Sequence, residues 1–183
     1  AVNKAASSFN TEKLLWLNQH YIKSDDPKRI AHLLSPHMGE LGIDPAEGPD
    51  LADVAEAHKE RANSLVEMAQ MAAFCYRDYE DFDAAAAKKH LRGVAREPLE
   101  RMRSVLESLG EWTEAGLHAA VQQVSDELEL KMGKVAQPLR VAVVGRAASP
   151  GIDVTLRLVG KEASLRRIDR ALEYIRQREA NAG

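Results

Sequence analysis

The chain has 183 residues, with 25 Lys and Arg against 28 Asp and Glu, and a formal net charge of −3. Its content of 45% hydrophobic and 29% charged residues excludes an intrinsically disordered chain, and no apolar run approaches the roughly 18 residues of a membrane span. The single cysteine, Cys75, excludes an intrachain disulfide framework, and the first residues lack the pattern of a signal peptide. We therefore expect a cytoplasmic protein that has no membrane partner.

The first half of the chain carries several helix signals. Asn10 stands where a capping residue would begin a helix, and Asp26-Pro27 begins another, because proline suits the first helical position. A segment rich in glycine and proline follows, which predicts a loop with at most one short helical turn. Asp50 then begins a helix whose apolar side continues to Ala72.

Helix signals continue in the second half, after an acidic and aromatic joint near residue 80. Asp83 can cap a run of alanines, a longer helix near Pro98 stops at Gly110, and Thr113 caps the next helix. Residues 152–159 alternate as a strand would, but Ser149-Pro150 in front of them is a good helix start, so we predict a helix.

A clear amphipathic helix closes the chain. Its apolar face is predicted from the helical spacing of Leu165, Ile168, Leu172 and Ile175, and this spacing leaves three arginines exposed, Arg166, Arg167 and Arg170. The whole pattern predicts an all-α protein of two packed helical subdomains, residues 1–80 and residues 81–183.

The charge is distributed unevenly between the two ends. Residues 131–183 hold 11 Lys and Arg against 5 Asp and Glu, a net charge of +6, whereas residues 1–130 hold 14 against 23, a net charge of −9. Such asymmetry indicates contact with a polyanion, although exposed helix faces are often basic without one.

No catalytic or metal-binding constellation is evident in the sequence. The six histidines have no metal-binding spacing with a supporting carboxylate, and Cys75 has no histidine near it in the sequence. Glycine-rich phosphate loops are missing as well. The residues alone predict a helical binding module with no catalytic residue and no metal.

Three segments resemble bacterial glutamyl-tRNA synthetases, which are class I aminoacyl-tRNA synthetases. They are KLLWLNQHYI at residues 13–22, EWTE at residues 111–114, and GKVAQPLR at residues 133–140 with the Gly145, Ser149-Pro-Gly151, Val159–Glu162 and Leu165–Ile168 segments that follow it. The resemblance spans almost the whole chain. It implies the helical anticodon-binding region of such an enzyme, without the catalytic half that uses ATP.

The resemblance therefore implies a chain that recognises the anticodon loop of the tRNA for glutamate, needs no cofactor and does not catalyse by itself. We expect a monomer. The alternative from the charge pattern alone is a helical protein–protein adaptor whose basic face meets an acidic partner.

The resemblance also implies roles for individual residues. Arg61, on the helix predicted from Asp50, corresponds to an arginine that contacts the third anticodon base, and Arg140 to an arginine near the first. The alternatives are a solvated helix arginine at Arg61 and an intramolecular ion pair at Arg140. Ser149, Pro150, Gly151 and Ile152 correspond to a turn that presses on the anticodon bases, and the candidate phosphate contacts are Arg146, Lys161, Arg166, Arg167 and Arg170.

Overall fold

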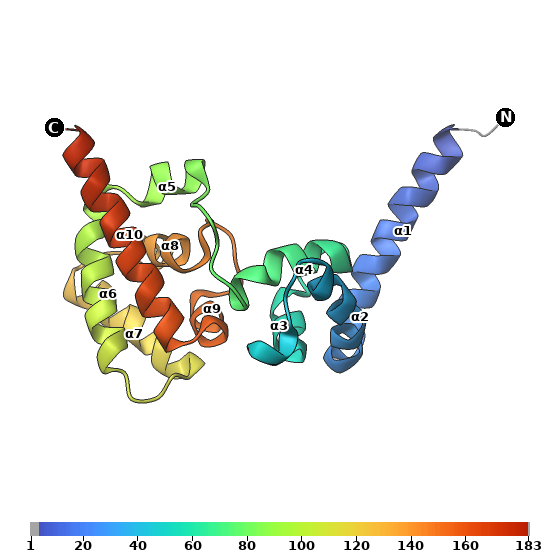
Figure 1. The fold of residues 1–183 in the computed structure, drawn as a ribbon, viewed down its shortest axis with the longest axis horizontal. Helices are drawn as coiled ribbons and strands as arrows, with labels where there is room; N and C mark the ends of the chain where they lie inside the picture. Colours follow the sequence, from blue (N-terminus) through green and yellow to red (C-terminus); the bar gives the residue numbers. More distant parts are fainter. Residues whose placement is uncertain (1–3, 183) are drawn as a thin grey trace. The chain divides into compact units, whose positions relative to one another are not determined.

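The computed structural model describes residues 4–182, with the side chains from Glu12 onward except that of Leu15. Within these residues the protein consists of helices and connecting segments and contains no strand, which confirms the all-α fold class (Figure 1). The chain forms two compact units, Ala1–Arg77 and Asp78–Gly183. The sequence places the boundary after residue 80, within the same connecting segment.

The first unit is built around α2 (Pro27–Glu40), which packs against α3 (Leu51–His58) and α4 (Leu65–Ala72). Its core contains the fully buried side chains of Leu34, Met38, Val54 and Met68. Two 3-10 turns, η1 (Pro45–Glu47) and η2 (Ala73–Cys75), complete the unit. As predicted, the Asp26 carboxylate caps α2 by accepting from the backbone N–H of Lys28 at 3.0 Å.

The first helix begins earlier than the sequence predicts. α1 (Lys4–Ser24) starts six residues before Asn10, so Asn10 lies inside a helix and is not its cap. The part of α1 before Asn10 contains Ala5 and Ala6, and alanine is a strong helix former that allows the helix to extend. Near its other end, Ile22 is buried, whereas Trp16 and Leu17 are exposed.

The helix predicted from Asp50 to Ala72 is in fact two helices. α3 ends at His58, and Ser64 begins α4 as an N-cap whose hydroxyl accepts from the backbone N–H of Glu67 at 3.1 Å. The apolar spacing does not indicate this break, because Ala62, which lies in the turn, is also buried and continues the pattern. The sequence does contain a signal for the break, since Ser64 and Glu67 have the spacing of a capping box.

The second unit surrounds one central helix, α8 (Met132–Val144). This helix contacts α5 (Ala84–His90), α6 (Arg96–Ser108), α7 (Glu114–Glu127), α9 (Ile152–Val159) and α10 (Lys161–Ala182), and the 3-10 turn η3 (Gly93–Ala95) lies beside it. The central position explains why Leu139 and the run from Val141 to Val144 are buried. β-Branched residues fit such a buried helix because packing, rather than propensity, decides their conformation.

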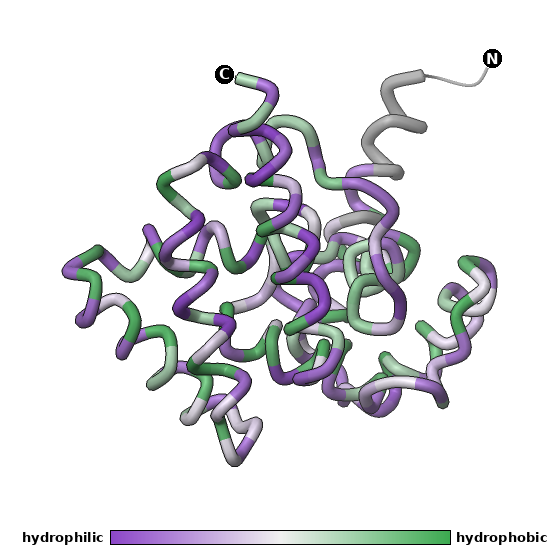
Figure 2. Tube along the Cα trace, turned by 60° about the vertical axis from the view of Figure 1, so that its left-hand side comes forward, coloured by the Kyte–Doolittle hydropathy of each residue, from purple (hydrophilic) through white to green (hydrophobic). Residues whose placement is uncertain are grey.

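Residues 152–159 form a helix, as predicted, despite their strand-like alternation. Ile152, Thr155 and Leu156 share its buried face, and the indole N–H of Trp112 donates to the carbonyl of Leu156 at 2.7 Å. Hydrophobic and hydrophilic residues interchange over short distances along the chain (Figure 2). Within the described residues, none of the helices combines the length and apolar character that a membrane span needs.

Candidate nucleic-acid interface

Two of the residues predicted for the site are in direct contact at the corner between α8 and α9. The Nε–H of Arg140, on α8, donates to the hydroxyl of Ser149 at 2.8 Å. Ser149 is only 4% exposed, whereas Arg140 is half-buried. We call Arg140, residues 145–151 and Thr155 the α8–α9 corner. In this corner a side-chain hydrogen bond joins the two parts of the predicted recognition segment, Arg140 on α8 and the turn that begins at Ser149.

The hydroxyl of Ser149 is part of a small buried network. Thr155 is fully buried, its Oγ1 lies 3.0 Å from Ser149 Oγ, and both hydroxyls lie within 2.9 Å of the carbonyl of Pro150. Each hydroxyl has one proton to donate. All groups are satisfied when Arg140 donates to Ser149, Ser149 to Thr155 and Thr155 to the Pro150 carbonyl. Hydrogen bonds arranged in such a chain polarise and strengthen one another.

The predicted turn at residues 149–152 lies at the end of the α8–α9 corner, where α9 begins. Pro150 and Ile152 are buried and Gly151 is exposed, so the turn presents its backbone to solvent at the glycine. Gly151 is the N-cap of α9, and a glycine has no side chain that could cap the N–H groups of the first turn. The turn can therefore offer backbone donors to a base or phosphate oxygen.

Glycine is required where α8 enters the corner. Gly145 ends α8 with φ of 83°, and a Cβ there would lie 2.7 Å from the Tyr79 ring. Its N–H donates to Val141, and its carbonyl accepts from the N–H of Asp83 at 2.8 Å. The next residue, Arg146, is exposed and makes no ion pair with any residue that the structure describes. Gly145 thus fixes the backbone direction from which Arg146 projects.

The arginines of α10 are engaged inside the second unit. Arg167 was expected to be exposed, and this expectation is wrong, because its side chain is only 4% exposed. It donates to the carbonyl of Val143 at 2.7 Å and to the carboxylate of Asp78 at 3.0 Å. Arg166 shares Asp78 at 2.8 Å, and this bond holds the pKa of the Asp78 carboxyl below its ordinary value.

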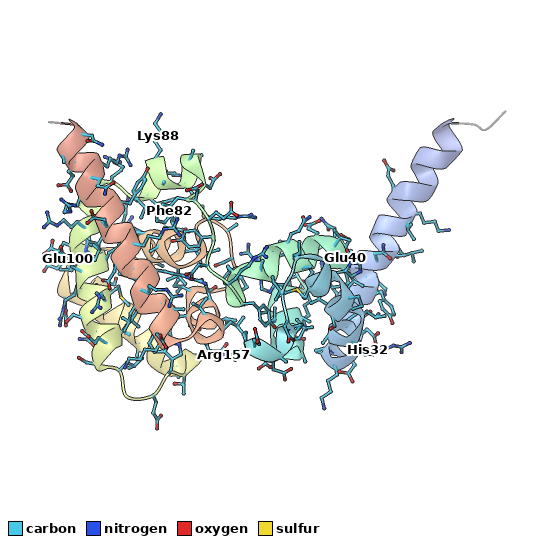
Figure 3. All side chains as sticks on the ribbon, viewed as in Figure 1. His32, Glu40, Phe82, Lys88, Glu100 and Arg157 are labelled. Atoms are coloured by element: carbon cyan, nitrogen blue, oxygen red, sulfur yellow. The ribbon has the colours of Figure 1, made fainter. Side chains whose placement is uncertain are left out.

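Arg170 and Lys161 also have partners within the unit. Arg170 donates to the carbonyls of Tyr79 and Glu80, and its guanidinium lies 4.6 Å from the centre of the Tyr79 ring. Lys161 donates to the carbonyl of Leu109 at 3.0 Å, which satisfies a carbonyl at the end of α6. Phe82, labelled in Figure 3, packs on Tyr79 and Tyr174 in the same cluster. These cations hold the unit together.

Arg61 belongs to the first unit and lies in the turn after α3. It was predicted on a helix, but α3 ends at His58, and Arg61 closes the turn by donating its backbone N–H to the His58 carbonyl at 3.0 Å. The Arg61 side chain is exposed. Beneath it, His58 is 1% exposed, and burial lowers the pKa of its imidazole, with the Arg61 charge adding to the effect.

Within the described residues, no group of three or more His, Cys, Asp and Glu side chains is arranged to hold a metal ion. Cys75, the single cysteine, is buried. The interface candidates described above are hydrogen-bond donors and cations. Sequence reasoning missed Thr155, whose signal was only a polar residue on the apolar face of α9.

A comparison with known protein families assigns most of the chain to one family. A family described as "Anticodon binding domain" matches residues 29–172, which is more than half of the chain. The chain belongs to this family. The match covers the α8–α9 corner, Arg61 and most of α10, so every predicted site residue lies inside the anticodon binding domain.

Solved structures give the same result for the fold. A glutamate tRNA ligase from Elizabethkingia meningosepticum matches 90% of this chain with a TM-score of 0.80 and 23% identity, and the match covers 32% of that protein. A glutamate-tRNA synthetase from Elizabethkingia anophelis matches 88% with a TM-score of 0.75 and 25% identity, covering 31% of that protein. The anticodon binding domain thus corresponds to the C-terminal part of these structures, as the sequence resemblance implied, and spans about a third of their length.

Proposed function

We propose that this anticodon binding domain recognises the anticodon loop of the tRNA for glutamate. Membership of the family supports tRNA binding in general, and the matched structures, both glutamate-tRNA ligases, support the choice of tRNA. In a longer protein that joins glutamate to tRNA with ATP, the domain supplies recognition, and it needs no cofactor of its own. The same proposal implies a monomer acting in the cytoplasm.

The observation that carries the proposal is the position of Arg140. Its guanidinium is held through Nε by a neutral buried hydroxyl, that of Ser149, beside the exposed backbone of the turn before α9. The hydrogen bond to Ser149 orients the Arg140 guanidinium. A guanidinium is a planar fork of donors, and such a fork suits the acceptors of a base edge. We assign base recognition to the Arg140 side chain and to the backbone of the turn at residues 149–152, with the Ser149 side chain positioning Arg140.

Two further roles complete the proposal. Arg61 contacts the third anticodon base from the first unit, and Arg146 contacts a phosphate of the loop. Both side chains are exposed, and neither makes an ion pair with a described residue. Arg166, Arg167, Arg170 and Lys161 have internal partners, so we assign them to the stability of the unit ahead of phosphate binding.

A filter-binding assay with the anticodon stem-loop of the tRNA for glutamate tests the proposal. Arg140→Ala should weaken binding by about 1–3 kcal/mol, the usual value for a base contact. The matched control is Arg101→Ala, because Arg101 is a half-buried arginine of the same unit that pairs with Glu127 across α6 and α7. The control should bind as the unchanged chain does.

Two results would contradict the proposal. Failure of the unchanged chain to bind the stem-loop at low salt would remove tRNA recognition from the domain in isolation. Equal competition by an unrelated acidic protein and by the stem-loop would instead favour a protein–protein adaptor. A chemical-shift map with the stem-loop gives the site directly, since perturbed amides should include those of Arg61 and Arg140.

A further inference from the structure

Tyr79 contacts the end of α8, although it belongs to the segment that precedes α5. Its hydroxyl donates to the carbonyl of Ala142 at 2.5 Å. A Cβ added at Gly145 would lie 2.7 Å from the Tyr79 ring, so the ring also packs directly on the residue that ends α8. The side chain is half-buried, and burial raises the pKa of its hydroxyl to about 12, so the hydroxyl keeps the proton that it donates.

The hydroxyl of Tyr79 supplies a donor that the backbone of α8 lacks. The helix ends at Gly145, which takes the left-handed conformation and donates its N–H back to the last turn. A helix that ends in this way leaves its following carbonyls without a backbone donor of the helix. In α8 the Ala142 carbonyl accepts from Tyr79, and the Val143 carbonyl accepts from Arg167. Two side chains therefore complete the end of α8.

Several groups of the second unit hold Tyr79 in place. The guanidinium of Arg170 lies 4.6 Å from the centre of the Tyr79 ring, and it also donates to the Tyr79 carbonyl at 2.8 Å. The ring of Phe82 lies 5.3 Å from that of Tyr79, centre to centre. Further along the same segment, the N–H of Asp83 donates to the carbonyl of Gly145 at 2.8 Å. A continuous set of contacts thus joins α10, the segment around Tyr79 and the end of α8.

The direction in which the chain leaves α8 determines where the rest of the α8–α9 corner lies. Residues 145–151 begin at that point and include Arg146 and the turn that bears Ser149. We propose that Tyr79 is a positioning residue for RNA recognition, whose hydroxyl fixes the direction in which residues 145–151 leave α8. This inference rests on the function proposed above. Tyr79 acts through the corner and does not itself contact the RNA.

Tyr76, in the first unit, provides a matched control. Its hydroxyl donates to the carbonyl of Pro49 at 2.9 Å, and its ring packs against Gly48, where a Cβ would not fit. Tyr76 is half-buried, as Tyr79 is. Tyr76→Phe and Tyr79→Phe therefore remove the same group, a hydroxyl that donates to a backbone carbonyl beside a glycine. Pro49 precedes α3 and Arg61 follows it, so Tyr76 does not hold the turn that carries Arg61.

Filter binding of the two full-length variants to the anticodon stem-loop of the tRNA for glutamate is the first test. Tyr79→Phe should weaken binding by about two- to tenfold, because it loses the orientation that one neutral hydrogen bond maintains. Tyr76→Phe should bind as the unchanged chain does, and urea unfolding should show similar losses of stability in the two variants.

A second stem-loop, with its first anticodon base replaced, separates positioning from stability. Partial unfolding of a variant lowers its affinity for both stem-loops alike, so their ratio does not change. Misplacement of the corner weakens the correct contacts more, so the ratio of the two affinities should fall in Tyr79→Phe and stay constant in Tyr76→Phe.

A third measurement needs no RNA. The Nε–H of Arg140 donates to Ser149, and NMR can follow the exchange of this proton with solvent. Because Ser149 lies on the segment that Tyr79 positions, Tyr79→Phe should speed the exchange by at least about twofold. Tyr76→Phe should leave the exchange rate unchanged.

The outcomes separate this inference from the proposed function. If the unchanged chain binds the stem-loop, equal effects of Tyr79→Phe and Tyr76→Phe on affinity and on the affinity ratio would overturn the role of Tyr79 and leave tRNA recognition standing. If the unchanged chain does not bind the stem-loop, tRNA recognition by the domain fails, and the exchange of the Arg140 proton decides alone. Faster exchange in Tyr79→Phe than in Tyr76→Phe would then support positioning of the corner by Tyr79, and equal exchange would overturn it.

Discussion

Replacing Ser149 by alanine isolates the contact that we consider central to recognition. The variant removes a hydroxyl that accepts from Arg140 at 2.8 Å and lies 3.0 Å from Thr155 Oγ1. Thr155 keeps its bond to the Pro150 carbonyl, so no buried group of the network loses every partner. Arg140 is half-buried, so part of its side chain is in contact with solvent. Two hydrogen bonds are lost, and we expect the free energy of unfolding to fall by about 1–2 kcal/mol.

The effect on RNA binding should follow from the loss of orientation of Arg140. Ser149 is almost fully buried, so it acts through Arg140 and does not itself reach the RNA. Ser149→Ala should therefore weaken binding of the anticodon stem-loop by less than Arg140→Ala does. In the double variant, Ser149→Ala should cost nothing further, because the group that it positions is already gone.

A double-mutant cycle measures this coupling. Urea unfolding gives the stability of each variant, and filter binding at fixed salt gives the four affinities. Thr155→Val provides a comparison, since it removes the neighbouring hydroxyl while Ser149 can still donate to the Pro150 carbonyl at 2.8 Å. Additive losses of RNA affinity for Arg140→Ala and Ser149→Ala would refute the reasoning and place Ser149 in contact with the RNA.

Three further predictions concern the stability of the two units. Gly145→Ala should lower the free energy of unfolding by at least about 2 kcal/mol, because alanine disfavours positive φ and its Cβ would meet the Tyr79 ring. Gly133 lies in a helix with open space around it, so Gly133→Ala should raise the free energy of unfolding by up to about 0.8 kcal/mol. Equal effects of the two variants in urea unfolding would contradict this account. Arg167→Met should destabilise by about 2–3 kcal/mol, since it leaves the buried carbonyl of Val143 without its partner, whereas Arg166→Met should cost less than about 1 kcal/mol, and thermal unfolding of both variants gives the comparison. Burial lowers the pKa of His58 below 6.5, so as the pH falls the unfolded chain binds a proton more readily than the folded chain does. The free energy of unfolding should therefore fall as the pH drops below 6.5. Urea unfolding between pH 7 and pH 5 measures this pH dependence, and His58→Phe should flatten it.

Much of the fold follows from local signals that the sequence shows directly. Four predicted N-caps are confirmed, those of Asp26, Asp50, Asp83 and Thr113. Such a cap depends only on local sequence, because the short side chain accepts from a backbone N–H two or three residues further along. The same locality explains the error at Arg61. The regular apolar pattern predicts one continuous helix through Arg61. In the structure, Ser64 caps the start of a separate helix, so Arg61 lies in the turn between the two helices.

The contacts of the candidate site were harder to predict, because they join residues far apart in the chain. Arg167 follows the spacing of an exposed position, yet its partner Asp78 lies 89 residues away. Nothing in the pattern of α10 indicates that carboxylate or the carbonyl of Val143. Ser149 and Arg140, by contrast, are nine residues apart, and the motif already grouped them. Helical periodicity predicts which side of a helix faces inward, but it does not predict which charged side chain is bound there.

The basic character of residues 131–183 therefore has two different origins. On α10, Arg166, Arg167 and Arg170 are held by a carboxylate and by backbone carbonyls, so most of their charge serves folding. On and beside α8, Lys134 and Arg146 have no such partner among the residues that the structure describes. If only these cations and the Arg140 guanidinium face the RNA, few phosphates are neutralised, and affinity should depend weakly on salt. When phosphate contacts contribute little to the binding free energy, the base contacts determine which tRNA is bound. A domain that recognises an anticodon requires such discrimination.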